Sequence, residues 1–348
     1  MDKLKLLLWP FAALYGGVTS LRNTAYTKGW FASRKFNLPV IAVGNLTVGG
    51  TGKTPHVEYL LRLLHNYRVA TLSRGYKRNT KGFVLADEKA TAATIGDEPF
   101  LYHADFKEVQ VAVSEKRVEG VEQLLQLKPR PEVIVLDDAM QHRAIQPSLN
   151  LLVTDYNRLF YKDHMLPAGL LREPKYGARR ADAVIVSKCP ATIQTSEMNS
   201  ITSRVQTYTR KGTPVFFTGF RYGQPVPIGN TGQLSKHIVL LTGIANAEPL
   251  KQYLKEHHFK LLHHASFPDH YSYRSSDMVY LKEELKKHPK DTIVLTTRKD
   301  AVKLMDASLQ NYSLQLPLFY IPVEVYFQCG GDNFNELILQ HVKSYTGR

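Results

Sequence analysis

Residues 44–55 read GNLTVGGTGKTP and have the residue types and spacing of a loop that binds nucleotide phosphates. Its glycines let the backbone turn tightly and point successive N–H groups at phosphate oxygens. Lys53 would reach the β- and γ-phosphates and stabilise charge during phosphoryl transfer, and the Thr54 hydroxyl would hold Mg²⁺. The residues that we expect to form this loop are Thr47, Val48, Gly49, Gly50, Thr51, Gly52, Lys53 and Thr54.

The segments on either side of the loop decide between a nucleotide site and a glycine-rich turn that binds nothing. Residues 40–43 (VIAV) read as a short β-branched strand, and apolar residues recur at helical spacing over 57–64. The order strand, loop, helix favours the nucleotide site. One position departs from the usual G-x-x-x-x-G-K-S/T pattern, because Thr47 stands where the first glycine is expected.

A second group of chemically useful residues follows a hydrophobic strand at residues 133–136. Asp137 and Asp138 come directly after it, which places two carboxylates at a sheet edge. A phosphate-binding enzyme needs an acidic residue there to hold or orient Mg²⁺, whereas paired acids are also common in turns. Together with the glycine loop upstream, the pair is interpreted as part of a metal site.

The segment TIGDEP (residues 94–99) has two interpretations. Asp97 could cap a helix, with Glu98 favouring the helix dipole and Pro99 opening the first turn. Alternatively, the loop faces the phosphates, Asp97 takes a proton from a hydroxyl nucleophile and Glu98 helps to hold the metal. The residues alone leave both readings open.

Other loops carry weaker signals. Asp269 and His270 in FPDH could be a capping acid beside a surface histidine or part of a site. SRGY (residues 73–76) and LPAGLLREP (residues 166–174) each place an arginine where it could contact phosphate or stay solvated. TTRKD (residues 296–300) is similar to a base-reading loop, but its spacing is wrong.

Composition limits the classes of protein. A chain of 348 residues suggests about two domains, and its two cysteines, Cys189 and Cys329, do not indicate a disulfide framework. No Cys/His cluster has zinc-ligand spacing. The formal net charge of +14 indicates an anionic partner such as nucleic acid, acidic lipid or a phosphorylated substrate.

The N-terminal segment favours a membrane surface as that partner. No acidic residue lies between Lys3 and Val57, and the apolar run 6–15 has about half of the ~20 residues needed to span a bilayer. A helix packed on the domain and a signal peptide are the alternatives. The basic and aromatic residues that interleave here are Lys3, Lys5, Trp9, Phe11, Tyr15, Arg22, Tyr26, Lys28, Trp30, Phe31, Arg34 and Lys35.

Strand-like and helical segments alternate along the chain, which predicts an α/β fold with a mostly parallel sheet flanked by helices. Around residues 205–235 glycine, proline and threonine become frequent, as expected for a connector. We therefore expect a membrane-associating segment (1–35), a P-loop domain (36–210), a strand-rich hinge (211–235), a second, smaller α/β domain (236–325) and a C-terminal helix that packs back on the first domain (326–348).

Taken together, the motifs resemble the tetraacyldisaccharide 4′-kinase family, the lipid A 4′-kinases of Gram-negative bacteria. The resemblance covers nearly the whole chain, in family order, and threonine at position 47 belongs to the family's version of the loop. The motifs that carry it are VGNLTVGGTGKTP, SRGY, GDEP, VLDDAMQHR, LPAGLLREP, FPDHYSY and TRKDAVKL.

The resemblance implies a P-loop NTPase-like enzyme that uses ATP and Mg²⁺ to phosphorylate the 4′-hydroxyl of tetraacyl glucosamine disaccharide 1-phosphate. The product would be the 1,4′-bisphosphate precursor of lipid A. The resemblance also implies a peripheral enzyme on the cytoplasmic face of the bacterial inner membrane. It implies no nucleic-acid partner, and no obligate protein partner is inferred.

By the same resemblance, Asp97 is the catalytic base and His270 its partner, and they would meet only when the two domains close. The sequence departs from the family in two segments: Ala139-Met140 replaces Gly-Phe, and Arg298 replaces glutamate. The other residues expected around the nucleotide and metal are Lys53, Thr54, Tyr76, Glu98, Asp137, Asp138 and Arg172.

Two other classes of P-loop protein are weighed against a kinase. A partition-type ATPase that acts as a switch needs lysine where Val48 stands. A nucleic-acid-dependent ATPase would explain the net charge, but the chain has no basic helix or base-stacking motif to support it.

Overall fold

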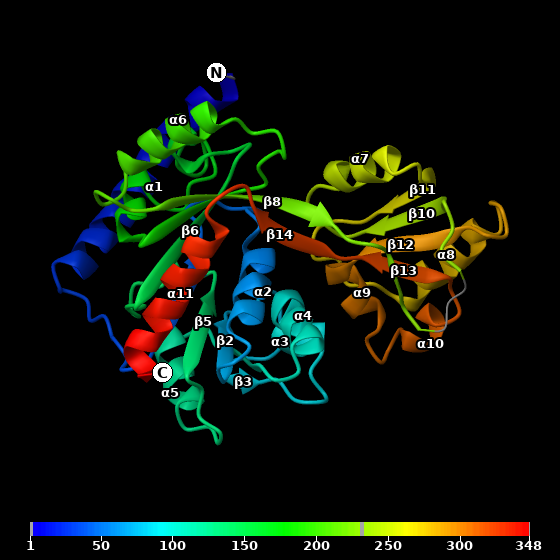
Figure 1. The fold of residues 1–348 in the computed structure, drawn as a ribbon, viewed down its shortest axis with the longest axis horizontal. Coiled ribbons are helices and arrows are strands. Elements are labelled where there is room, and N and C mark those ends of the chain that lie inside the picture. Colours follow the sequence, from blue (N-terminus) through cyan, green and yellow to red (C-terminus); the bar gives the residue numbers. More distant parts are fainter. Residues whose placement is uncertain (1–2, 230–232, 348) are drawn as a thin grey trace.

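The computed structural model describes residues 3–229 and 233–347, and it contains two sheets flanked by helices (Figure 1). The larger sheet has nine strands in the order β14-β8-β7-β6-β1-β5-β2-β4-β3. Its strands are β1 (Val40–Gly44), β2 (Val69–Ser73), β3 (Val84–Leu85), β4 (Gln110–Val113), β5 (Val133–Asp137), β6 (Leu149–Asp155), β7 (Ala183–Ser187), β8 (Val215–Tyr222) and β14 (Val323–Phe327).

The centre of this sheet is parallel and buried on both faces, because its strands are short runs of β-branched and aliphatic residues. At the sheet's two edges the pairing is antiparallel, between β3 and β4 and between β8 and β14. Strand β1 lies between β5 and β6, with Val43 opposite Asp137. The predicted phosphate loop therefore starts beside the predicted carboxylate pair.

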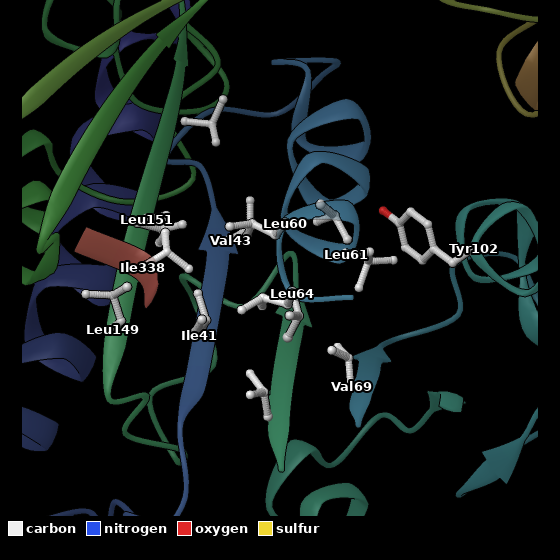
Figure 2. Close-up of a cluster of buried hydrophobic side chains, with 14 of the residues drawn as sticks. Ile41, Val43, Leu60, Leu61, Leu64, Val69, Tyr102, Leu149, Leu151 and Ile338 are labelled. Atoms are coloured by element: carbon white, nitrogen blue, oxygen red, sulfur yellow. The ribbon is translucent and has the colours of Figure 1, made fainter. Parts of the chain in front are cut away.

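Helices cover both faces of the larger sheet. In Figure 2, Leu60 and Leu64 lie toward the sheet residues Val43 and Ile41, Leu61 lies on the side of Tyr102, and Ile338 from the C-terminal helix lies beside Leu151. The helices of this part of the chain are α1 (Lys3–Thr27), α2 (Lys53–Leu63), α3 (Ala92–Ile95), α4 (Asp97–Asp105), α5 (Arg117–Leu124), α6 (Thr195–Gln206) and α11 (Gly331–Thr346), with 3₁₀ turns at Phe160–Lys162 and Lys175–Arg180.

The smaller sheet has five strands in the order β11-β10-β12-β13-β9. Its strands are β9 (Val226–Pro227), β10 (His237–Thr242), β11 (Lys260–Ser266), β12 (Ile293–Thr297) and β13 (Leu318–Ile321). Its helices are α7 (Glu248–Glu256), α8 (Ser275–Leu285), α9 (Arg298–Leu304) and α10 (Gln310–Ser313). The predicted α/β class and the mostly parallel arrangement are confirmed.

Two neighbouring strands link the sheets. The stretch around residues 205–235, which was expected to be a connector, contains β8. This strand pairs with β7 and then runs beside β14 toward the smaller sheet (Figure 1). At the crossing, Gly223 donates a backbone hydrogen bond to Pro322 at 2.9 Å. The remainder of that stretch includes β9, and residues 230–232 lie outside the described part of the chain.

Helix α1 lies against the larger domain. Tyr15 donates a hydrogen bond to the carbonyl of Arg172 at 3.0 Å, and Asn23 donates one to Glu173 at 2.9 Å. The side chains of Lys3 and Lys5 lie outside the described residues. Among the helices that the structure describes, none is both long enough and apolar enough to cross a membrane.

Candidate active site

The loop between β1 and α2 has the backbone geometry of a phosphate cradle. Gly49 and Gly52 have φ angles of +99° and +87°, in the left-handed region that glycine adopts without strain. A side chain at Gly49 or Gly50 would point into open space, whereas one at Gly52 would come within 2.6 Å of the Phe220 ring. No side chain caps the start of α2, so its first N–H groups are left for an anion.

The start of the loop is tied to the LPAGLLREP segment. Val48 donates its backbone N–H to Leu170 at 2.8 Å, and Arg172 donates its own to Leu46 at 2.7 Å. Thr47 is buried between them. These bonds hold the loop in place, and the N–H of Val48 is already used within the protein.

Lys53, Asp138 and Arg172 form a charged group beside the loop. Lys53 Nζ lies 3.5 Å from Asp138 Oδ1, and both oxygens of Asp138 accept from Arg172, at 3.0 and 2.7 Å. Lys53 and Arg172 also contact Asn45, a residue that sequence reasoning missed although it directly follows β1. Desolvation alone would raise the pKa of Asp138, but the two cations outweigh it and hold that pKa well below its usual range.

Asp137 lies next to this group but in a different environment. It is buried, Tyr102 donates a hydrogen bond to its Oδ2 at 2.9 Å, and its Oδ1 accepts none from the described residues. Burial raises the pKa of Asp137 to about 7, with the Glu98 charge adding to the rise and Lys53 opposing it. Nearby, Thr54 donates a hydrogen bond to Glu98 at 3.3 Å.

These oxygen groups fit Mg²⁺. A buried carboxylate oxygen without a partner suits a hard divalent cation, and so do a hydroxyl and a second carboxylate. Within the described part of the chain, no cluster of three or more His, Cys, Asp or Glu side chains forms a cage of its own. That is the usual situation for Mg²⁺ that is held by one or two protein carboxylates and by substrate phosphates.

Asp97 and His270 come together across the two domains, with His270 Nδ1 3.1 Å from Asp97 Oδ2. Asp97 is the first residue of α4, and Gly96 occupies the N-cap position without a side-chain cap, so the interpretation of Asp97 as a capping residue is wrong. His270 is largely buried, rather than at the surface, and the Tyr76 ring packs edge-on against it at 5.3 Å.

Two lysines from α9 complete the surroundings of this pair. Lys303 Nζ lies 3.4 Å from Asp97 Oδ2, and Lys299 Nζ lies 3.3 Å from both ring nitrogens of His270. Burial would raise the pKa of Asp97, but the hydrogen bond from His270 and the charges of Lys303 and Lys299 lower it. The carboxylate is thus kept ionised and able to accept a proton. Sequence reasoning missed both lysines as site residues.

The predicted residues therefore form one continuous site. Asp97 and Glu98 are neighbours at the start of α4: the first contacts His270 and the second contacts Thr54 of the phosphate loop. Asp137 and Asp138 lie at the end of β5, beside the strand that leads into that loop. Tyr76 joins the group through His270.

A parallel sheet with a glycine loop, a lysine–threonine pair and strand-end carboxylates defines a P-loop NTPase-like nucleotide-binding protein. The family model described as tetraacyldisaccharide-1-P 4′-kinase matches residues 4–343. The chain belongs to this family of kinases.

Individual relatives agree with this assignment. The tetraacyldisaccharide 4′-kinase of Flavobacterium johnsoniae is 43% identical, over 99% of this chain and 98% of the relative. The protein of the same name from Bacteroides thetaiotaomicron is 42% identical, over 99% and 95%. The crystal structure of LpxK from Aquifex aeolicus in complex with ATP superposes with a TM-score of 0.74 at 31% identity, covering 97% of this chain and 99% of that one. A switch-type or nucleic-acid-dependent ATPase is not favoured.

Proposed function

We propose that this protein transfers the γ-phosphoryl group of ATP to the 4′-hydroxyl of tetraacyl glucosamine disaccharide 1-phosphate. Family membership supports the reaction, and the ATP complex of the Aquifex aeolicus relative supports the donor. The observation that carries the proposal is the turn at the start of α4, where Asp97 meets His270 and Glu98 meets Thr54. With Asp97 as the base, this turn would hold the proton acceptor next to the phosphate loop.

ATP would lie with its phosphates along residues 49–54, with Lys53 between the β- and γ-phosphates. Thr54, Glu98 and Asp137 offer the oxygens that suit Mg²⁺, and Asp138 would orient Lys53 and Arg172. When bound, Mg²⁺ neutralises charge on the β- and γ-phosphate oxygens. Thr47, which is buried, and Val48, which donates its N–H to Leu170, would hold the start of the loop in place.

Asp97 would accept the proton of the sugar hydroxyl as the hydroxyl oxygen bonds to the γ-phosphorus and the bond to the departing ADP breaks, because an alcohol is a weak nucleophile until that proton leaves. His270 would orient this carboxylate, and Tyr76 would fix the histidine ring. Since the pair includes one residue from each domain, we further propose that closure about the β8–β14 link assembles the site and excludes water.

The lipid would reach the site from a membrane surface along α1. Five apolar residues of this helix are 60–71% exposed, and their spacing places them on one stripe: Leu7, Phe11, Leu14, Val18 and Leu21. The opposite face carries Ala12, Gly16 and Asn23, which lie toward the domain. An apolar stripe with basic flanks is typical of a helix that lies in a membrane interface.

The substrate's four acyl chains would hold it in a bilayer, and ATP is supplied from the cytoplasm. We therefore propose that the protein acts peripherally on the cytoplasmic face of the inner membrane. Because α1 hydrogen bonds to Arg172 and Glu173, the membrane-facing helix is anchored directly to the nucleotide site.

The test is transfer of ³²P from [γ-³²P]ATP to tetraacyldisaccharide 1-phosphate in mixed micelles. We expect a labelled bisphosphate lipid, Mg²⁺ dependence and little ATP turnover without lipid. Parallel reactions with nucleic acid in place of lipid should show no stimulation. ATP hydrolysis that nucleic acid stimulates, without label in lipid, would refute the proposal.

A further inference from the structure

Helices α4 and α9 face each other across the boundary between the two domains (Figure 1). Their termini pair in opposite order: Asp97 at the start of α4 meets Lys303 near the end of α9, and Asp105 at the end of α4 meets Arg298 at the start of α9. The two helices are therefore antiparallel, with an ion pair between the domains at each end.

The Arg298–Asp105 ion pair lies at the end of α4 opposite to Asp97, the proposed base. The Arg298 Nε lies 3.0 Å from each oxygen of Asp105, and a terminal guanidinium nitrogen contacts the same carboxylate. The guanidinium also lies over the Tyr320 ring at 4.6 Å. Both charged side chains are only about a quarter exposed, so solvent screens them less than an ordinary surface pair.

The ion pair at the other end of the two helices, between Lys303 and Asp97, includes the proposed catalytic base. Lys303 is 5% exposed and donates a hydrogen bond to the carbonyl of Tyr271 at 2.9 Å. Its ammonium also lies 3.2 Å from Asp300 and 3.4 Å from Asp97. Because Tyr271 directly follows His270, one buried cation links the histidine loop to the carboxylate.

We propose that Arg298 and Lys303 are positioning residues, forming a two-point clamp that holds α9 against α4 so that His270 reaches Asp97. This inference rests on the proposed role of Asp97. Asp105, the partner of Arg298, lies about two helical turns from Asp97 along α4, so any effect of Arg298 on rate must come through the arrangement of the domains. If the closed arrangement is less populated, the observed activity falls in proportion.

Charge reversal tests the Arg298 end. Arg298→Asp and Asp105→Arg should each lower kcat/KM about tenfold or more, whereas the double variant, which restores an ion pair, should recover to within about threefold of wild type. Arg210→Asp is the matched control, because Arg210 pairs with Asp182 within one domain. Arg298→Gln provides a milder variant in case a reversed charge prevents folding.

Full activity of Arg298→Asp or of Arg298→Gln would overturn the clamp. A folded double variant no better than the single variants would also overturn it. Asp97→Asn is assayed in parallel. If Asp97→Asn stays active, the proposed base is wrong, whatever the clamp variants do. If it is inactive while the Arg298 variants are fully active, only the clamp fails.

Lys303 is tested by removing its cation. Lys303→Met loses the contacts to Asp97 and to the Tyr271 carbonyl and should lower kcat/KM about tenfold or more. Lys303→Arg keeps a cation at this position and should stay within about threefold of wild type. Full activity of Lys303→Met, or an equal loss in the two variants, would overturn the role of Lys303 in the clamp.

Discussion

The pKa values of two neighbouring carboxylates, Asp137 and Asp138, shift in opposite directions because their surroundings differ. Asp138 is paired with Lys53 and Arg172, and its pKa falls, whereas Asp137 is buried beside Glu98 and its pKa rises to about 7. The sequence predicted an acidic pair at the end of β5 but could not distinguish its members. Their different neighbours come from separate loops, which only the folded chain brings together.

The raised pKa of Asp137 has a consequence for stability. A carboxyl whose pKa is higher in the folded state than in the unfolded chain takes up a proton on folding. Stability should therefore fall as pH rises from about 4 to about 7, with a slope of up to ~1.4 kcal/mol per pH unit. Unfolding measured across this range without Mg²⁺ should show the decrease.

The control is Asp137→Asn, which cannot ionise but can still accept from Tyr102, and which should have a weaker pH dependence. Glu58, whose pKa is also raised to about 7 by burial, contributes a slope of the same sign in both proteins. Mg²⁺ with nucleotide should stabilise wild type more at pH 8 than at pH 6. Equal pH dependence of the two proteins would contradict the account of Asp137.

The second prediction about a single residue concerns Lys53. Lys53→Ala should lower turnover on the order of 10²-fold or more, because a cation next to the transferred phosphoryl group is lost. Lys286→Ala serves as the control, since Lys286 is an exposed residue just after α8 that pairs with Glu283. Near-normal turnover of a folded Lys53→Ala protein would refute the phosphate loop.

At the scale of elements, strands rich in β-branched residues could be predicted because their residue types match buried parallel strands. Strands β13 and β14 were not predicted: Pro322 separates them, and each pairs with a segment distant in the sequence. The positions of Lys299 and Lys303 also could not be predicted, since their contacts depend on how α9 meets α4. Asp97 and Glu98 could be placed near the site through their motif, and the start of a helix was predicted there, one residue later than α4 begins.

The prediction about a single helix concerns α1 and its binding to membranes. Replacing Phe11 and Leu14 with aspartate should weaken co-sedimentation with anionic vesicles about tenfold or more, because charge is added to the apolar stripe. ATP binding should stay unchanged, and Val279→Asp, at an exposed position on α8, should behave as wild type. Vesicle binding unaffected by the double change would show that α1 is not the docking surface.

At the scale of the whole molecule, the site belongs to neither domain alone. The larger domain contributes the glycine loop, Glu98, Asp137 and Asp97, and the smaller domain contributes His270, Lys299 and Lys303. In the closure proposed above, the β8–β14 link would let the two sheets remain intact while the distance between these groups changes. A kinase built in this way can delay catalysis until both substrates are enclosed, which limits wasteful hydrolysis of ATP.

The most direct test of this account is a double-mutant cycle on kcat for lipid phosphorylation with Asp97→Ala, His270→Ala and the combined variant. Asp97→Ala should lower kcat by roughly 10²–10⁴-fold, the usual loss when a general base is removed, with little change in nucleotide affinity. His270→Ala should cost less, and the combined variant should be little worse than Asp97→Ala alone, because the two residues act as one unit. Losses that multiply fully in the combined variant would show independent roles and would contradict the pairing of Asp97 with His270.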